Sequence, residues 1–264
     1  MNNQLSKDTY NSSLQKAGAV MDDMRLLVRN WTDSDIKPQQ EKVITENVLG
    51  KETRSRSVDT LRRTFIPRFV KGDPPKAWKI IRPLEDRNVA SELITPIYYW
   101  VTARAEPLIY RFMEDEILPR SQGVDQRIRI DETKTWITRV LSETDQEWSD
   151  VVTTKVARGL LAALRDFGIL KGKSKKEIDS AYLPIESFSY IAFALSKLGA
   201  SGERLVQHPD WKLFLMTPPV VERLFLAAHQ QGHLRYESAG RIHRIEFNAA
   251  TFEEMADVVT GKAF

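Results

Sequence analysis

One order of local patterns occurs twice in the second half of the chain, and it constrains the fold more than any other feature. An amphipathic helical stretch is followed by a glycine, a short β-like run, a basic turn and a second β-like run. The two copies align LLAALRDFGILK (160–171) with LFLAAHQQGHLR (224–235). This order is typical of a winged helix, in which a helix enters the major groove of DNA and a β-hairpin touches the flanking backbone.

Helical periodicity dominates the remainder of the chain, with prolines and glycines between the periodic stretches. The longest expected helices cover residues 13–31, 35–49, 57–69, 86–104, 106–119, 133–143, 153–167, 186–198, 218–231 and 251–260. Residues 171–184 are expected to form a charged hairpin or loop. HLRYES and RIHRIEF are expected to form two strands around a turn at Ala239 and Gly240.

The clearest lapse in periodicity lies at residues 120–132, where glycine and charged residues take over. The sequence therefore predicts a mainly α protein of two domains. An N-terminal helical bundle is expected at 1–122, and a C-terminal winged-helix-like region with short β-hairpins at 123–264.

Composition excludes several classes of protein. A hydrophobic content of 42% with 28% charged residues is that of a globular chain. The absence of cysteine excludes disulfides and thiol catalysis. The N-terminus lacks an apolar run, and the apolar stretch LITPIYYWV (93–101) is too short to cross a bilayer. We therefore expect a cytoplasmic protein without a membrane partner.

Charge is segregated along the chain, although the net charge is only +3. Residues 51–82 contain ten Lys or Arg against three acids, an excess of +7, which leaves −4 for the remainder. Segregation of this kind is typical of a nucleic-acid footprint, but a solvated helix face explains the local charge equally well.

The segment RSRSVDTLRRTFIPRF (54–69) lies within this basic window. At 100° per residue its apolar side chains form one stripe, and Thr64 lies on the outward face. Arg62 is expected to pack its stem at the edge of the stripe, and Arg54 and Arg68 have no predicted role. With the preceding helix, residues 35–69 have the outline of a helix-turn-helix. The stripe consists of Val58, Leu61, Phe65 and Phe69, and the candidate contacts opposite it are Arg56, Thr60 and Arg63.

A second basic face is expected on the helix 153–167. Lys155 and Arg158 point outward there, and four lysines follow within six residues of the next turn. Backbone contacts from a wing or a solubilising loop both account for those lysines. Arg241 lies in the C-terminal hairpin, which is either a second wing or a cap on the core. The four lysines are Lys171, Lys173, Lys175 and Lys176.

Catalytic and metal-binding patterns are scarce. The chain has no phosphate-binding GxxxxGK[ST] loop, no GxGxxG turn and no GxSxG elbow. His229 and His233 have metal-ligand spacing, but Gly232 is expected to end the helix between them. We therefore expect no enzyme activity, no cofactor and no metal.

The C-terminal motifs also carry a family resemblance. ARGLLAALRDFGILKG (157–172), SGERLVQHPDWKLFL (201–215) and VERLFLAAHQQGHLRY (221–236) resemble the BrxA family of the bacterial BREX (bacteriophage exclusion) defence systems. The resemblance implies a small, mostly helical, non-enzymatic accessory protein that binds nucleic acid. It also implies N-terminal helices similar to those of the RNA-binding antitermination factor NusB, and other BREX components as candidate partners.

The basic faces and the resemblance together predict binding to double-stranded DNA, mainly through phosphates. One alternative is RNA binding by the N-terminal bundle. Another is a scaffold that joins other defence proteins, for which we expect an exposed apolar patch within residues 100–112. The predicted DNA contacts are Arg56, Thr60, Arg63, Lys155, Arg158, Lys171, Lys173, Lys175, Lys176 and Arg241.

Overall fold

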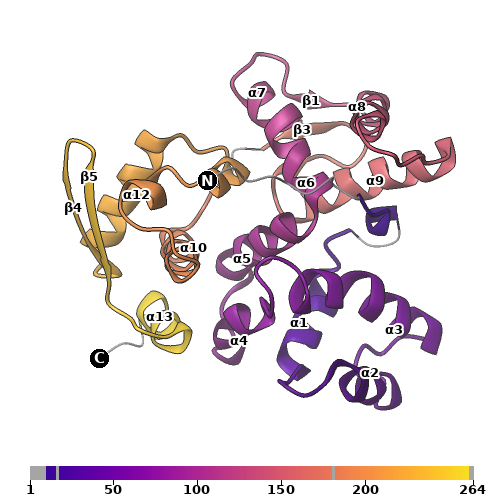
Figure 1. The fold of residues 1–264 in the computed structure, drawn as a ribbon, viewed down its shortest axis with the longest axis horizontal. Helices are drawn as coiled ribbons and strands as arrows, with labels where there is room; N and C mark the ends of the chain where they lie inside the picture. Colours follow the sequence, from indigo (N-terminus) through magenta and orange to yellow (C-terminus); the bar gives the residue numbers. More distant parts are fainter. Residues whose placement is uncertain (1–9, 16–17, 180–181, 262–264) are drawn as a thin grey trace.

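The computed structural model describes residues 10–15, 18–179 and 182–261, and it confirms a mainly α chain with a few short strands (Figure 1). The first part contains only helices: η1 (Ser13–Gln15), α1 (Met21–Asn30), α2 (Ile36–Thr45), α3 (Arg54–Thr60), η2 (Leu61–Val70), α4 (Trp78–Asp86), α5 (Ser91–Ala105), α6 (Pro107–Phe112), η3 (Met113–Ile117) and α7 (Leu118–Ser121).

Two mixed units follow these helices. The middle unit consists of β1 (Arg127–Ile128), α8 (Ile130–Ser142), α9 (Asp150–Asp166), β2 (Leu170–Lys171) and β3 (Lys176–Ile178). The C-terminal unit consists of α10 (Ile185–Lys197), α11 (Glu203–Val206), η4 (Pro209–Phe214), α12 (Pro218–Gln230), β4 (Leu234–Ala239), β5 (Ile242–Phe247) and α13 (Phe252–Val259).

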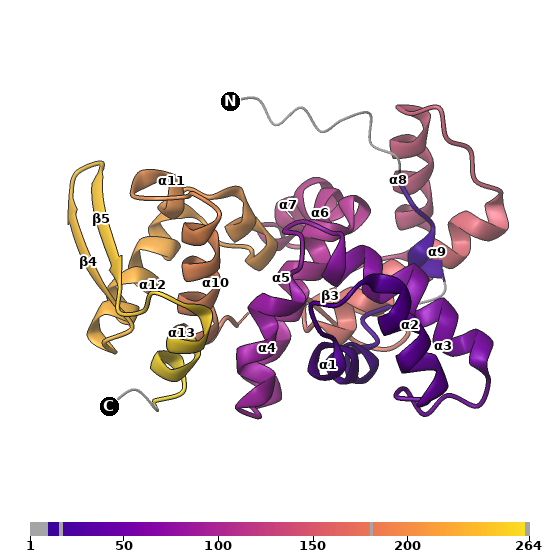
Figure 2. The ribbon, with the colours of Figure 1, turned by 60° about the horizontal axis from the view of Figure 1, so that its bottom comes forward.

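Helix α5 joins the parts of the molecule. It lies between the N-terminal helices and α10 (Figures 1 and 2), and residues 97–103 are all buried. The indole of Trp100 donates to Asp210 Oδ2 of η4 at 2.7 Å, and the hydroxyl of Tyr99 donates to the carbonyl oxygen of Leu213 at 3.1 Å. Most of the short apolar stretch of the sequence therefore lies in the core of the fold.

The predicted helix at 13–31 is divided in two. Val20 has a positive φ of 42°, so the chain turns sharply between η1 and α1. Segment η1 packs instead on α9, where a Cβ on Gly159 would lie only 1.7 Å from the carbonyl oxygen of Leu14. The helix is divided because of this long-range contact between η1 and α9, which helical periodicity does not reveal.

The middle unit forms a three-stranded antiparallel sheet in the order β1-β3-β2. Helix α9 ends before Gly168, whose φ of +78° suits a residue without a side chain. The charged segment predicted as a hairpin or loop is a hairpin, because Leu170 pairs with Ile178 and Lys171 with Glu177. Strand β1 was not predicted; it lies in the stretch interpreted as a domain boundary.

The C-terminal hairpin is confirmed, with its turn one residue later than predicted. Ala239 pairs with Ile242, so Gly240 and Arg241 form the turn, and Gly240 has a positive φ of 62°. Tyr236 packs its ring on Phe225 of α12, which fastens the hairpin to the helix before it.

The basic segment 54–69 is helical, but its second half is a π-helix. Phe65 and Phe69 of the predicted stripe are fully buried. Thr64, which was expected to lie outward, is also buried, because the i→i+5 hydrogen bonds of a π-helix place more residues in each turn and shift the later side chains.

Candidate nucleic-acid interface

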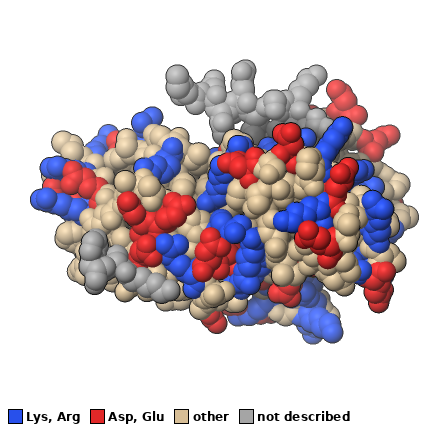
Figure 3. Space-filling view, turned by 90° about the horizontal axis from the view of Figure 1, so that it is seen from below, with Lys and Arg blue, Asp and Glu red and all other residues tan. Residues whose placement is uncertain are grey.

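The basic window 51–82 is largely neutralised by folding. Seven of its ten cations pair with acids, and four of those acids lie outside the window. The outside acids are Asp23, Asp33, Asp86 and Glu106. Figure 3 shows cations and acids interleaved on the face seen from below. The local excess of charge in the sequence therefore overstates the positive charge of this surface.

The predicted contacts Arg56 and Arg63 are both exposed and both paired. Arg56 Nη1 lies 3.0 Å from Glu52 Oε2, and Arg63 Nε lies 3.1 Å from Asp59 Oδ1, each across one helical turn. Thr60 lies between them and is half-buried. Exposed pairs of this kind are weak, so both guanidinium groups can exchange their partners for phosphates.

The cations of this region that have no acidic partner are not the predicted contacts Arg56 and Arg63. Within the described parts of the chain, no ion pair involves five exposed cations of α2, α3, η2 and the residue after η2, which we call the α2–α3 surface. Sequence reasoning missed them, although the spacing of the acids could have indicated them. Arg56 and Arg63 each follow an acid by four residues, the spacing of an ion pair along a helix, whereas Arg54 and Arg62 do not. The α2–α3 surface consists of Lys37, Lys42, Arg54, Arg62 and Lys71.

A second group of cations lies on α9 and the β2–β3 hairpin, as the sequence predicted. Lys155 and Arg158 are exposed on α9, and neither makes an ion pair within the described residues. Ser149 caps the helix by accepting from the amide of Val152, which fixes the start of this face. We call the group the α9–hairpin surface: Lys155, Arg158, Lys171, Lys173, Lys175 and Lys176.

The hairpin lysines differ in their surroundings. Lys171 Nζ lies 3.7 Å from Asp179, whereas Lys173 and Lys175 are exposed without an ion pair in the described chain. Lys176 Nζ donates to the carbonyl oxygen of Lys173 at 2.9 Å. Burial, together with the nearby Arg165, lowers the pKa of Lys176. Positive charge is therefore crowded here without a matching number of acids.

A cavity of about 440 Å³ brings part of this surface together with β1. We call it the cationic cavity. It is lined by Arg127, Ile128, Arg129, Ile130, Asp131, Arg158, Leu161, Ser174, Lys175 and Lys176. Five of these residues are basic and one is acidic, so the cavity is suited to an anion.

Arg127 and Arg129 are functional candidates that the sequence analysis missed. Arg127 Nε lies 2.8 Å from Asp125 Oδ1, and Arg129 Nη1 lies 2.8 Å from Glu132 Oε1. The side-chain hydrogen bond from Arg127 lowers the pKa of Asp125 to about 2. The alternation RIRI (127–130) is a period-two signal that could have indicated a strand here.

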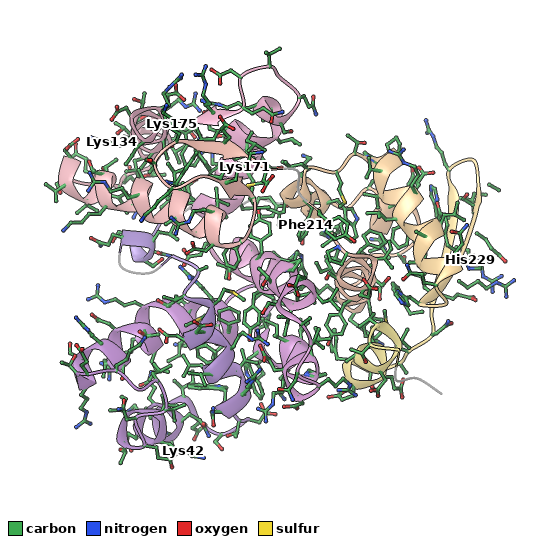
Figure 4. The ribbon with its side chains drawn as sticks, turned by 180° about the vertical axis from the view of Figure 1, so that it is seen from behind. Lys42, Lys134, Lys171, Lys175, Phe214 and His229 are labelled. Carbon is green, nitrogen blue, oxygen red and sulfur yellow. The ribbon has the colours of Figure 1, made fainter. Side chains whose placement is uncertain are left out.

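The candidate contacts do not form one patch. In Figure 4, Lys134 and Lys175 lie at one end of the molecule and Lys42 at the opposite end. Arg241 is exposed in the turn of the C-terminal hairpin, which Figure 2 shows on the far side from α3. The α2–α3 surface and the α9–hairpin surface are therefore separate.

The histidines have structural partners. His233 is buried, and its Nδ1 lies 3.0 Å from the hydroxyl of Ser189, while His229 Nδ1 accepts from the amide of Tyr236 at 3.4 Å. In the described parts of the chain, no three His, Cys, Asp or Glu side chains are grouped so that they could hold a metal ion.

The region expected to carry an apolar patch is interior. Trp100, Leu108, Ile109 and Phe112 are all at most 2% exposed. Of the helices in the described residues, none has the length and apolar character needed to span a membrane.

Comparison with known proteins adds a family and a fold. The model of a family described as BrxA matches residues 8–194, more than half of the chain. No curated protein matches the sequence. The crystal structure of an uncharacterized protein from Magnetospirillum magneticum is similar, with a TM-score of 0.54 and 14% identity, over 72% of this chain and 95% of that one. At this identity the likeness shows the fold alone.

Proposed function

The chain belongs to the BrxA family of BREX phage-defence components, and from this premise we propose that it is a non-enzymatic accessory protein that binds double-stranded DNA. Most of the binding energy comes from contacts between cations and phosphates. The contacts lie first on the α9–hairpin surface and second on the α2–α3 surface.

The observation that carries this proposal is the pairing of the surface charges. Lys155, Arg158, Lys173 and Lys175 make no ion pair with any described residue, whereas most cations elsewhere have an acidic partner. A phosphate backbone supplies the missing negative charge, and it releases its own counterions on binding. Unpaired cations on one surface are therefore expected where the ligand is a polyanion.

The topology of the middle unit supports a specific mode of docking. The chain order β1-α8-α9-β2-β3, with sheet order β1-β3-β2, is the order expected for a winged helix. In this mode α9 enters the major groove, and the turn between β2 and β3 lies along the flanking backbone. Lys155 and Arg158 then face the groove, and Lys173 and Lys175 face phosphates.

Duplex DNA is favoured over a single strand by the burial of the aromatic side chains in the N-terminal basic segment. Proteins that bind single-stranded RNA or DNA stack bases on exposed aromatic rings. Phe65 and Phe69, the aromatic residues beside the N-terminal basic segment, are both fully buried. The N-terminal helices therefore offer phosphate contacts rather than a stacking surface.

The test is a fluorescence-anisotropy titration of the full chain with duplex DNA, single-stranded DNA and RNA of matched length. We expect duplex DNA to bind at least about tenfold more tightly than either single strand, because the aromatic rings of the N-terminal basic segment are buried and give bases no stacking surface there. Tighter binding to RNA than to duplex DNA would favour the NusB-like alternative.

A further inference from the structure

The cationic cavity has both depth and an apolar lining, which a contact with a phosphate on a flat surface does not require. It lies between β1, the start of α8, the middle of α9 and the hairpin turn, and its volume is about 440 Å³. We propose that this cavity binds a nucleoside 5′-phosphate, either a free nucleotide or the terminal nucleotide of a DNA strand. The inference deepens the proposed function and rests on it only in taking nucleic acid as the ligand chemistry.

The cations of the cavity provide the phosphate half of the site. Arg158 and Lys175 line it, and neither makes an ion pair within the described chain. Lys176 lines it too and is half-buried beside them, while Asp131 is the one acid in the lining. A phosphate between Arg158 and Lys175 satisfies donors that have no described partner, and the guanidinium group can bind two of its oxygens at once.

The aliphatic residues of the lining provide the nucleoside half. Ile128 and Leu161 are at most 5% exposed, and Ile130 is half-buried, so they form an apolar floor beneath the cations. Inorganic phosphate has no apolar part that could pack against these aliphatic side chains, whereas a nucleoside has one. The volume falls within the range of about 300 to 1,000 Å³ that is usual for ligand pockets. A base and its sugar are therefore suited to the part of the cavity that the phosphate does not fill.

The backbone of the hairpin turn is held in place by its own contacts. Gly172 has a φ of +87°, and a Cβ there would lie 1.9 Å from the carbonyl oxygen of Lys175. The turn is therefore tightly closed, and the pairing of Leu170 with Ile178 and of Lys171 with Glu177 anchors both of its ends. A site that is already ordered loses less entropy when its ligand binds.

The test is isothermal titration calorimetry of the full chain with 2′-deoxyadenosine 5′-monophosphate (dAMP) and, separately, with inorganic phosphate. The variants are Arg158→Ala, Lys175→Ala and the matched control Arg223→Ala, which removes an exposed arginine of α12 that makes no ion pair within the described chain and lies outside the cavity. We expect saturable dAMP binding that each cavity variant weakens about tenfold and that the control leaves within about twofold.

Inorganic phosphate is expected to bind at least about tenfold more weakly than dAMP, because it leaves the apolar floor uncovered. Equal affinities for the two would overturn the nucleoside part of the proposal. The absence of saturation by about 10 mM dAMP, or equal effects of Arg158→Ala and Arg223→Ala, would overturn the whole of it.

Two duplexes distinguish the source of the nucleotide. If the cavity holds a strand end, a duplex with 5′-phosphates binds more tightly than the same duplex with 5′-hydroxyls, and dAMP competes only with the former. If it holds a free nucleotide, the two duplexes bind equally. Binding of dAMP without duplex binding would support the cavity site and contradict the proposed function. Duplex binding without dAMP binding would support the proposed function and contradict the cavity site.

Discussion

The guanidinium group of Arg68 donates through Nε to Glu106 Oε1 at 2.8 Å in the interior, where both side chains are at most 2% exposed. Arg68 also donates to the carbonyl oxygen of Gly18 at 2.9 Å, and Glu106 accepts from the hydroxyl of Ser13. The pair therefore links η2 to Gly18, to Ser13 of η1 and to the start of α6. One of the five arginines in the basic segment is a core residue and cannot reach a ligand.

Loss of Arg68 alone is expected to destabilise the protein strongly. Arg68→Met leaves the carboxylate of Glu106 buried without its charged partner, and removal of one member of a buried pair costs about 3–5 kcal/mol. The measurement is the free energy of unfolding in urea. Arg68→Met/Glu106→Leu should recover most of the loss, and Arg54→Met, at an exposed site, should change stability by less than about 0.5 kcal/mol.

A second prediction concerns Gly159 in the middle of α9. Helix propensity alone predicts that Gly159→Ala stabilises the protein by about 1 kcal/mol. The close approach of the Leu14 carbonyl predicts the opposite sign, a loss of about 1–3 kcal/mol, because η1 must move away from α9. Urea unfolding distinguishes the two, and a stabilised variant would show that η1 does not pack on α9 in solution.

A third prediction distinguishes the effect of charges on the α9–hairpin surface from the effect of the protein's net charge on DNA binding. Lys173→Glu/Lys175→Glu places two acids on the α9–hairpin surface and is expected to weaken duplex binding about 100-fold. The control Arg235→Glu/Arg244→Glu makes the same change in net charge at exposed arginines already paired with Glu237 and Glu246. Anisotropy titration of both should show a loss below about fivefold for the control; equal losses would mean that only net charge matters.

Two histidines, the buried His233 and the half-buried His208, predict a loss of stability in mild acid. Burial lowers the pKa of both His208 and His233 below the usual value. As the pH falls below about 6.5, the unfolded chain therefore binds protons that the folded chain does not, and stability decreases until the pH reaches the folded pKa. Each histidine contributes a slope of at most about 1.4 kcal/mol per pH unit.

The measurement is the urea unfolding free energy between about pH 7 and pH 5. His208→Asn/His233→Asn removes both titrating groups and retains side-chain acceptors for the amide of Asp210 and the hydroxyl of Ser189. We expect this variant to have a flatter pH dependence in that range. A slope identical to that of the unmodified chain would assign the acid sensitivity to other groups.

Local patterns were enough to predict most helices and the C-terminal hairpin, and they left residues 171–184 open between a hairpin and a loop. The apolar spacing along α9 and the glycine after it are local features, and so are the alternation and turn residues of β4 and β5. Strand β1 has only two residues and pairs with β3, about fifty residues later, so its local signal is limited to the four-residue alternation RIRI (127–130).

The candidate site could be predicted only in part. Lys155, Arg158 and the hairpin lysines were identified because they are exposed cations close together in the sequence. The neutralisation of the basic window could not be predicted, because Asp23, Asp33 and Glu106 reach it from distant positions in the chain. The π-helix that buries Thr64 and Arg68 depends likewise on tertiary packing.

The salt dependence of duplex binding tests the central claim most directly. If the α9–hairpin surface and its neighbours neutralise about six phosphates, the logarithm of the association constant falls with the logarithm of salt concentration at a slope near −5. Reversal of Lys173 and Lys175 should make that slope shallower by about two. Anisotropy titrations of the full chain across a series of salt concentrations measure both values. A slope near zero would contradict phosphate-based DNA binding.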